Sequence, residues 1–295
     1  MLAIKTLVSN LSVYRHSAML MGDRFEISVV GDNPGWAQER INDAIKEINR
    51  VDKLLSTFGE DSTINQVNRN AGIKPVKVNP ELYRLIDRSL QISELTYGVF
   101  DISYTTGDKV SAKINYNHIV LDPAAQTVFL TKAGMRISFA ANAKGYAADR
   151  AKYVLQMQDV SSGVINAGGD LLAWGLQPDN EEWTVGAADI EQENQPYAGL
   201  NISNMAFATS VNNNHYKTAN KFPGAINPAN GFEVSAIQSV SILSPTAELA
   251  DAMATPVIKM GVNAGIYLIN QLNQMACVII DDNKRMYTSK HIAIN

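Results

Sequence analysis

Apolar positions along the chain recur with two different periods, which predicts a mixture of helices and strands. Segment 25–30 alternates apolar and polar residues at its start, as a strand does. From 41 to 55 the apolar residues recur on one face of a helix. A second helix is predicted from Asn79, which can cap it, with Pro80 at the first helical position, where a missing N–H does no harm.

The second half of the chain alternates more strands with helices. A hairpin is predicted where segments 118–121 and 127–130 flank a short turn. Further helices are predicted from about Lys144 and near 246–255 and 263–274. Other predicted strands are 163–166, 183–187, 237–243 and 276–280. Because strands come in hairpin-like runs rather than in strict β-α-β alternation, the pattern favours the α+β class over a doubly wound parallel sheet.

Composition fits one globular unit. The 295 residues are 46% hydrophobic and 18% charged, as in ordinary folded proteins. We find no repeat and no linker rich in Pro, Gly or Ser, so we expect a single domain over 1–295. The net charge is −4 and basic residues form no stripe, which argues against a nucleic-acid partner. The single cysteine, Cys277, lies in an apolar segment and is predicted to be a buried thiol.

Membrane and export signals are also missing from the pattern. Residues 1–8 lack a basic start followed by an apolar block and a cleavage site. No apolar run approaches the roughly 20 residues that a membrane helix needs. We therefore expect no membrane partner and a cytoplasmic location.

Two oxygen-bearing residues, Asp251 and Thr255, are the first candidates for chemistry. They are four residues apart in a segment for which Ser244 is a plausible cap, so a helix would place both on one face. Mg²⁺ prefers hard oxygen ligands and keeps several waters, so one carboxylate and one or two neutral oxygens suffice. Pro256 cannot donate an N–H and can expose carbonyls nearby. The spacing by itself fits the polar face of any helix equally well.

Two glycine-containing segments are candidates for binding an anion or a nucleotide. Lys144 and Gly145 open a predicted helix, whose N-terminus attracts negative charge, and the lysine adds a compact cation there. The alternative is an ordinary helix start with a solvated lysine. Gly168 and Gly169, followed by Asp170, permit positive φ and a close approach to a ligand, or simply a tight turn.

In their order and spacing, the segments 141–149, 166–170 and 250–255 resemble the ApbE-like family of flavin transferases. The resemblance implies an α+β, T-fold-related fold of mixed sheets with packed helices, with an FAD site in a cleft between two halves. It also implies Mg²⁺-dependent transfer of FMN from FAD to a Thr or Ser hydroxyl of an acceptor protein, with release of AMP. FAD is then a substrate and Mg²⁺ a cofactor.

The resemblance assigns roles to individual residues. Asp251 and Thr255 would be catalytic and would bind the metal together with the backbone carbonyl of Ala141. The residues implied as FAD contacts are Met21, Phe58, Val99, Phe100, Asp101, Ser138, Lys144, Gly168, Gly169, Asp170, Thr209 and Ile226. Ser138 stands where the family has an acid near the adenine. Phe58 stands where an aromatic side chain would stack on a flat ring, and a plain core aromatic is the alternative.

One family motif is altered. In segment 222–231, Gly224 takes the place of a family histidine and Asn227 the place of an aspartate. General acid–base help is typically worth about 10²–10⁴-fold. His215 could substitute, although a solvated loop histidine is the simpler interpretation. The altered motif leaves two alternatives to the transferase: a catalytically weakened FAD-binding protein, or an FAD pyrophosphatase giving FMN and AMP. Retention of both Asp251 and Thr255 favours the transferase.

Overall fold

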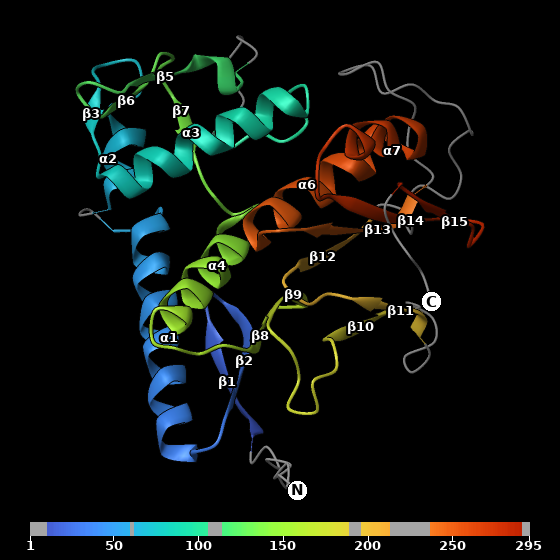
Figure 1. The fold of residues 1–295 in the computed structure, drawn as a ribbon. Coiled ribbons are helices and arrows are strands. Elements are labelled where there is room, and N and C mark those ends of the chain that lie inside the picture. Colours follow the sequence, from blue (N-terminus) through green and yellow to red (C-terminus); the bar gives the residue numbers. More distant parts are fainter. Residues whose placement is uncertain (1–10, 60–61, 106–113, 189–195, 213–236, 291–295) are drawn as a thin grey trace, which may run out of the picture.

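The computed structural model describes residues 11–59, 62–105, 114–188, 196–212 and 237–290. An antiparallel sheet of eight described strands runs through the molecule (Figure 1). Its order is β1 (Ser12–Leu20), β2 (Asp23–Gly31), β8 (Gly163–Ala167), β9 (Asp170–Trp174), β12 (Ala206–Val211), β13 (Ile237–Ser244), β14 (Ala276–Asp281) and β15 (Met286–Thr288). Where the resemblance implied mixed sheets, the described strands pair only antiparallel. The α+β class is confirmed.

Three helices lie side by side on one face of this sheet (Figure 1). They are α1 (Pro34–Leu55), α4 (Ala143–Gln156) and α6 (Ala247–Met260), and α7 (Val262–Asn270) follows α6. The helix face predicted from the apolar spacing of segment 41–55 is the one that α1 buries. The other face of the sheet packs a smaller apolar cluster, which includes Trp183 and Phe207, beside the hairpin of β10 (Thr184–Ala188) and β11 (Pro196–Asn201).

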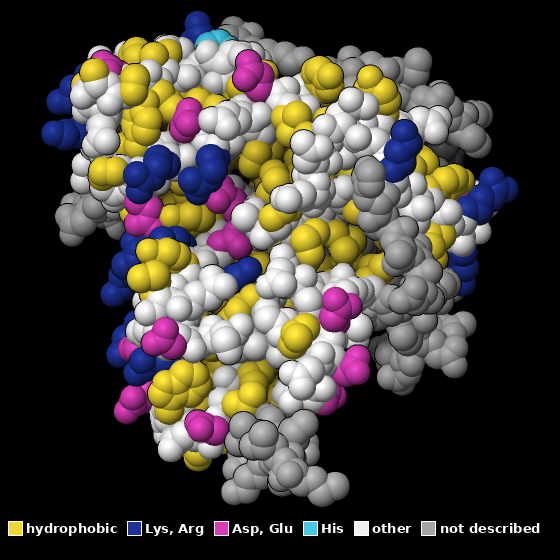
Figure 2. Space-filling view, in the orientation of Figure 1, with side chains coloured by type: hydrophobic (Ala, Val, Ile, Leu, Met, Phe, Trp, Pro, Cys, Tyr) yellow, Lys and Arg dark blue, Asp and Glu magenta, His cyan; other side chains and the backbone are white. Residues whose placement is uncertain are grey.

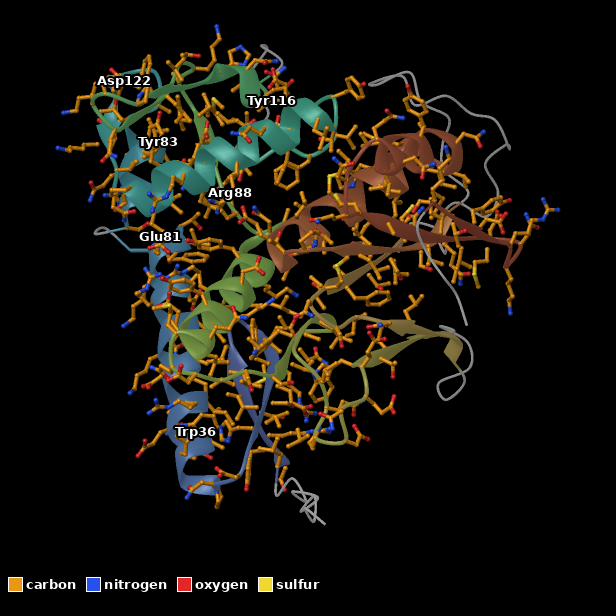
Figure 3. The ribbon with its side chains drawn as sticks, viewed as in Figure 1. Trp36, Glu81, Tyr83, Arg88, Tyr116 and Asp122 are labelled. Atoms are coloured by element: carbon orange, nitrogen blue, oxygen red, sulfur yellow. The ribbon has the colours of Figure 1, made fainter. Side chains whose placement is uncertain are left out.

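A smaller group of elements packs above α1 and α4 in Figure 1. Its elements are α2 (Thr63–Arg69), β3 (Val76–Lys77), α3 (Pro80–Leu95), β4 (Ser103–Thr105), the 3₁₀ helix η1 (Tyr116–His118), β5 (Ile119–Asp122), β6 (Thr127–Leu130) and β7 (Met135–Ile137). Its apolar residues, such as Leu82 and Leu130, belong to the same buried cluster as those between the helices and the sheet. Figure 3 shows Glu81 and Arg88 on the side of α3 that faces α1, α4 and α6.

Local sequence signals set most of these boundaries. Asn79 caps α3, because its side-chain oxygen accepts a hydrogen bond from the N–H of Leu82 at 2.8 Å. The predicted cap of α6 was wrong: Ser244 is buried at the end of β13, and Thr246 caps the helix through the N–H of Leu249. Cys277 is buried as predicted, and burial raises the pKa of its thiol to about 11.

The charged side chains do not segregate on the face drawn in Figure 2. Lys and Arg side chains there lie among Asp and Glu, particularly along the α1 edge. Ion pairs such as Lys46 with Asp43 and Arg50 with Glu47 account for part of this mixing. Among the described helices, none combines the length and apolarity required to cross a membrane.

Candidate functional site

Two tight hairpin turns lie next to each other near the start of α4. Met21 and Gly22 connect β1 to β2 with φ values of 53° and 78°, and Gly168 and Gly169 connect β8 to β9 with φ values of 71° and 110°. Two-residue hairpin turns of this kind favour glycine because positive φ is costly for other residues. A Cβ on Gly168 would lie 2.4 Å from Oδ2 of Asp23. The absence of a side chain at Gly168 therefore lets the two turns pack together.

Lys144, in the first turn of α4, points at this pair of turns. Its ammonium donates a hydrogen bond to Oδ2 of Asp23 at 3.0 Å. Burial disfavours the charged form, but the bond to Asp23 and the nearby carboxylates of Asp170 and Asp251 together raise the pKa of Lys144. The same hydrogen bond lowers the pKa of Asp23. A fixed cation therefore stands at the N-terminal end of a helix.

The first of two adjoining pockets opens beside Lys144 and has a volume of about 350 Å³. Its lining residues are Met21, Gly22, Asp23, Asp52, Leu55, Ser56, Thr57, Phe58, Ser138, Phe139, Ala140, Ala143 and Lys144. The side chain of Phe58 is 85% exposed, so the core-aromatic interpretation is wrong. The N–H of Phe58 donates to Oγ of Ser56 at 3.1 Å, which holds the turn that presents the ring.

The second pocket, of about 320 Å³, lies between the end of α3 and one face of α6. Its lining residues are Val99, Phe100, Asp101, Ala140, Ala141, Lys144, Asp251, Ala252, Thr255, Pro256 and Lys259. Ala140 and Lys144 line both pockets, so the two spaces adjoin at the start of α4. Residues from the smaller group of elements thus face residues of the helical layer across the site.

Asp251 and Thr255 do share a face of α6, and both line the second pocket. Oδ2 of Asp251 accepts a long hydrogen bond from the N–H of Gly145 at 3.4 Å, and the hydroxyl of Thr255 lies 3.3 Å from that of Ser210. Burial, followed by the negative charge of Asp170, raises the pKa of Asp251 to about 7. With this raised pKa, the carboxyl titrates close to neutral pH.

The second pocket presents hard oxygen atoms that could bind a metal ion. Ala141, Asp251 and Thr255 line the same space and offer a backbone carbonyl, a carboxylate and a hydroxyl. No cluster of three or more His, Cys, Asp or Glu side chains suited to a metal occurs in the described ranges. Pro256 has no N–H to donate to the carbonyl of Ala252 one turn earlier, and both residues line the pocket. This chemistry fits Mg²⁺, which needs few protein ligands.

Asp101, another predicted FAD contact, stabilises the backbone beside the second pocket. Both oxygens of Asp101 accept backbone N–H groups, from Ser103 at 2.7 Å and from Tyr116 at 2.9 Å. This carboxylate shapes the loop that brings Val99 and Phe100 to the second pocket.

The predicted residues on the sheet lie beside the pockets rather than on their walls. Asp170 accepts the N–H of Thr209 at 3.2 Å, and burial raises the pKa of its carboxyl. Gly168, Gly169, Asp170 and Thr209 line neither pocket. Ile226, together with Gly224, Asn227 and His215, lies outside the described residues.

Some residues that line the two pockets were not predicted from the sequence to belong to a site. Asp23 lies two positions after Met21, a predicted FAD contact, and this proximity was the available signal for it. Lys259 stands four residues after Thr255 and therefore on the same helical face. Asp52 near the end of α1 lines the first pocket, and the helical pattern gave no indication of this.

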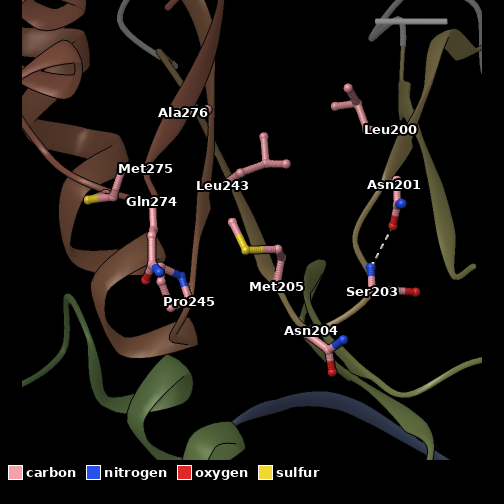
Figure 4. A pocket seen from close by; sticks show the side chains of 10 residues that line it. All are labelled: Leu200, Asn201, Ser203, Asn204, Met205, Leu243, Pro245, Gln274, Met275 and Ala276. Carbon is pink, nitrogen blue, oxygen red and sulfur yellow. Dashed lines mark hydrogen bonds between the residues drawn. The ribbon is translucent and has the colours of Figure 1, made fainter. Parts of the chain in front are cut away.

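A further pocket, of about 530 Å³, lies away from these residues (Figure 4). Its lining residues are Leu200, Asn201, Ser203, Asn204, Met205, Leu243, Pro245, Gln274, Met275 and Ala276. None of these side chains is ionisable, and none belongs to a segment for which the sequence predicted chemistry. Size alone therefore does not make this pocket the functional site.

Comparison with known proteins gives a consistent picture. The model of the ApbE family matches residues 21–279. A FAD:protein FMN transferase of Klebsiella pneumoniae (strain 342) is 24% identical over 305 residues, covering 96% of this chain and 93% of the relative. That of Treponema pallidum (strain Nichols) is 24% identical over 320 residues, covering 95% and 87%.

Solved structures show the same fold. The flavin transferase ApbE from Vibrio cholerae superimposes with a TM-score of 0.78 at 19% identity, covering 95% of this chain and 98% of that one. The ApbE protein from Thermotoga maritima gives a TM-score of 0.76 at 22% identity, covering 95% and 97%.

Proposed function

This chain belongs to the ApbE family, and we propose that it transfers the FMN half of FAD to a Thr or Ser hydroxyl of an acceptor protein, releasing AMP. One observation carries the proposal: Ala141 and Lys144 at the start of α4 line the same pocket as Asp251 and Thr255 of α6. The names of the curated relatives support the same reaction.

The two adjoining pockets suit the parts of FAD. The pyrophosphate would bind where Lys144 and the N-terminus of α4 supply positive charge. The exposed ring of Phe58 would offer a face for stacking in the first pocket. FAD would thus span the junction at Ala140 and Lys144, which line both pockets.

Asp251, Thr255 and the carbonyl of Ala141 would hold Mg²⁺. When bound, the metal neutralises charge on the pyrophosphate and orients it. Lys144, which lines both pockets, would bind the same group. Its raised pKa keeps the ammonium charged at neutral pH.

The transfer forms a bond from the acceptor hydroxyl oxygen to the FMN phosphorus and breaks the bridging P–O bond. AMP leaves with the bonding electron pair, and the hydroxyl proton is released. Phosphoryl transfer depends mainly on positioning and charge stabilisation. Activity is therefore compatible with Gly224 and Asn227 in the altered motif.

The proposal is tested with purified protein, FAD and Mg²⁺, with and without EDTA, and with and without an acceptor peptide that contains a Thr. We expect AMP release that requires the metal and FMN attached to the peptide. Asp251→Asn should abolish both products, whereas Asp282→Asn, at the exposed turn after β14, should leave both unchanged.

The other outcomes separate the alternatives. Metal-dependent AMP and free FMN without a labelled peptide would identify an FAD pyrophosphatase. Tight FAD binding without AMP in either sample would identify a binding protein. Full turnover by Asp251→Asn would refute the metal assignment.

A further inference from the structure

Asp149 joins α4 to the first turn of α6. Its Oδ1 accepts the N–H of Ala247 at 2.9 Å, and its Oδ2 accepts the N–H of Glu248 at 2.8 Å. These residues directly follow the cap Thr246. Helix N-termini leave such N–H groups without helical partners, and a carboxylate there also interacts favourably with the helix dipole.

The two helices also approach closely one turn earlier on α4. A Cβ on Gly145 would lie 2.3 Å from the carbonyl oxygen of Ala247. The N–H of Gly145 points to Oδ2 of Asp251 at 3.4 Å. Backbone therefore packs against backbone at Gly145, and the two hydrogen bonds of Asp149 lie one turn further along α4.

The two halves of the candidate metal site come from the two chain segments that meet at this contact. Ala141 precedes α4, whereas Asp251 and Thr255 lie one and two turns along α6 from Ala247. We propose that Asp149 is a positioning residue, whose two hydrogen bonds keep Asp251 and Thr255 of α6 opposite the carbonyl of Ala141. This inference rests on the proposed metal-dependent function.

Other charged groups around this turn do not replace Asp149. Glu248 pairs with Arg88 of α3 at 2.8 Å, and Arg88 lies over the ring of Tyr146. That ion pair ties α6 to α3. The described hydrogen bonds between α4 and the first turn of α6 both end on Asp149.

The test compares metal binding with folding. Asp149→Asn keeps the size of the side chain, but its NH₂ group would face one of the two backbone N–H donors. Asn33→Ala is the matched control, because Asn33 caps α1 through the N–H of Trp36 at 3.0 Å. Removing such a cap typically costs about 1 kcal/mol. Mn²⁺ binding by electron paramagnetic resonance and unfolding by circular dichroism are measured for the wild type and both variants.

We expect Asp149→Asn to weaken Mn²⁺ binding about tenfold or more, as losses of supporting contacts around metal ligands do. Asn33→Ala should lower the melting temperature by a similar amount, but it should change the Mn²⁺ affinity less than about twofold. Wild-type affinity in folded Asp149→Asn would overturn the inference, and so would equal weakening in Asn33→Ala. If Asp149→Asn does not fold, Asp149→Ser, which keeps one acceptor, takes its place under the same criteria.

The wild-type titration separates this inference from the proposed function. Mn²⁺ binding by the wild type that is lost in Asp251→Asn supports the metal site itself. No Mn²⁺ binding by the folded wild type would refute the metal site and the role of Asp149 with it. Normal wild-type binding with an unaffected Asp149→Asn would refute the role of Asp149 alone.

Discussion

The ammonium nitrogen of Lys144 lies 3.0 Å from Oδ2 of Asp23, although the two residues are 121 positions apart in the chain. The contact connects the first turn of α4 with the start of β2. It holds the lysine side chain beside both pockets and pairs the ammonium with a carboxylate. A bound pyrophosphate would therefore have to share Lys144 with Asp23 or displace it.

Lys144→Met should weaken FAD binding by about 10- to 160-fold, because a hydrogen bond to a charged group contributes about 1.5–3 kcal/mol. Flavin fluorescence titration would measure the change. Lys74→Met, at an exposed position away from both pockets, is the control and should bind FAD as the wild type does. Equal affinity in Lys144→Met and the wild type would exclude the lysine from the nucleotide site.

Metal binding should weaken as the pH falls below 7. The pKa of Asp251 is raised to about 7, by burial first and by the charge of Asp170 second. Protons therefore compete with the metal below that pH, and at pH 6 the apparent affinity should be about tenfold below its plateau.

Mn²⁺ titrations between pH 5.5 and 8.5 would measure this dependence. Asp170→Asn removes the second cause and should move the midpoint to lower pH. Metal affinity that does not change across this range would show that Asp251 is not the titrating ligand.

Gly145→Ala should destabilise the protein and disturb the site together. The new methyl group would lie 2.3 Å from the carbonyl oxygen of Ala247, and backbone atoms cannot give way as a flexible side chain can. We expect a loss of about 1–3 kcal/mol in the free energy of unfolding, together with weaker metal binding. Gly35→Ala is the control, since its nearest neighbour is a side-chain oxygen at 3.3 Å. Denaturant unfolding of both variants would measure the free energy of unfolding and show whether α4 and α6 can move apart without loss of stability.

Local patterns predicted the long helices and the inner strands β2, β8, β13 and β14, because their apolar residues recur over several turns or positions, whereas the inner strands β9 and β12 were not predicted. The N-cap and Pro of α3 agree with the structure because both signals act on the backbone of the first helical turn itself. The edge strand β1 was not predicted, since most of its side chains are exposed and its composition carries no apolar alternation. The three-residue strands β4 and β7 are too short to show a period, and they form by pairing with each other.

The sequence motifs identified most residues of the second pocket but not what their side chains do. Asp101 is a pocket residue whose carboxylate binds backbone N–H groups, and a motif cannot distinguish that role from ligand contact. The pair of Lys144 and Asp23 depends on packing between distant segments. The role of Asp149 as a cap of α6 likewise appears only when α4 and α6 are in contact.

Phe58→Ala should lower FAD affinity while leaving stability nearly unchanged. The ring is 85% exposed and adds little to the core, yet it lines the first pocket. Stacking on a flat ring contributes about 0.5–1.5 kcal/mol, so we expect a roughly 2- to 12-fold weaker complex. Phe58→Tyr keeps the aromatic face and should restore binding. A stable Phe58→Ala protein with unchanged FAD affinity would place the flavin and adenine rings elsewhere.

Asn142→Leu should stabilise the protein. Asn142 is fully buried at the start of α4, and neither its side-chain nitrogen nor its oxygen has a hydrogen-bond partner among the described residues. An unsatisfied buried polar group costs about 1–3 kcal/mol, and leucine has the same branching without polar atoms. Because leucine is larger, part of that gain will be lost to tighter packing, and we expect a net gain of about 1 kcal/mol. Thermal unfolding measures it, and a lower melting temperature would mean that the amide has a partner in solution.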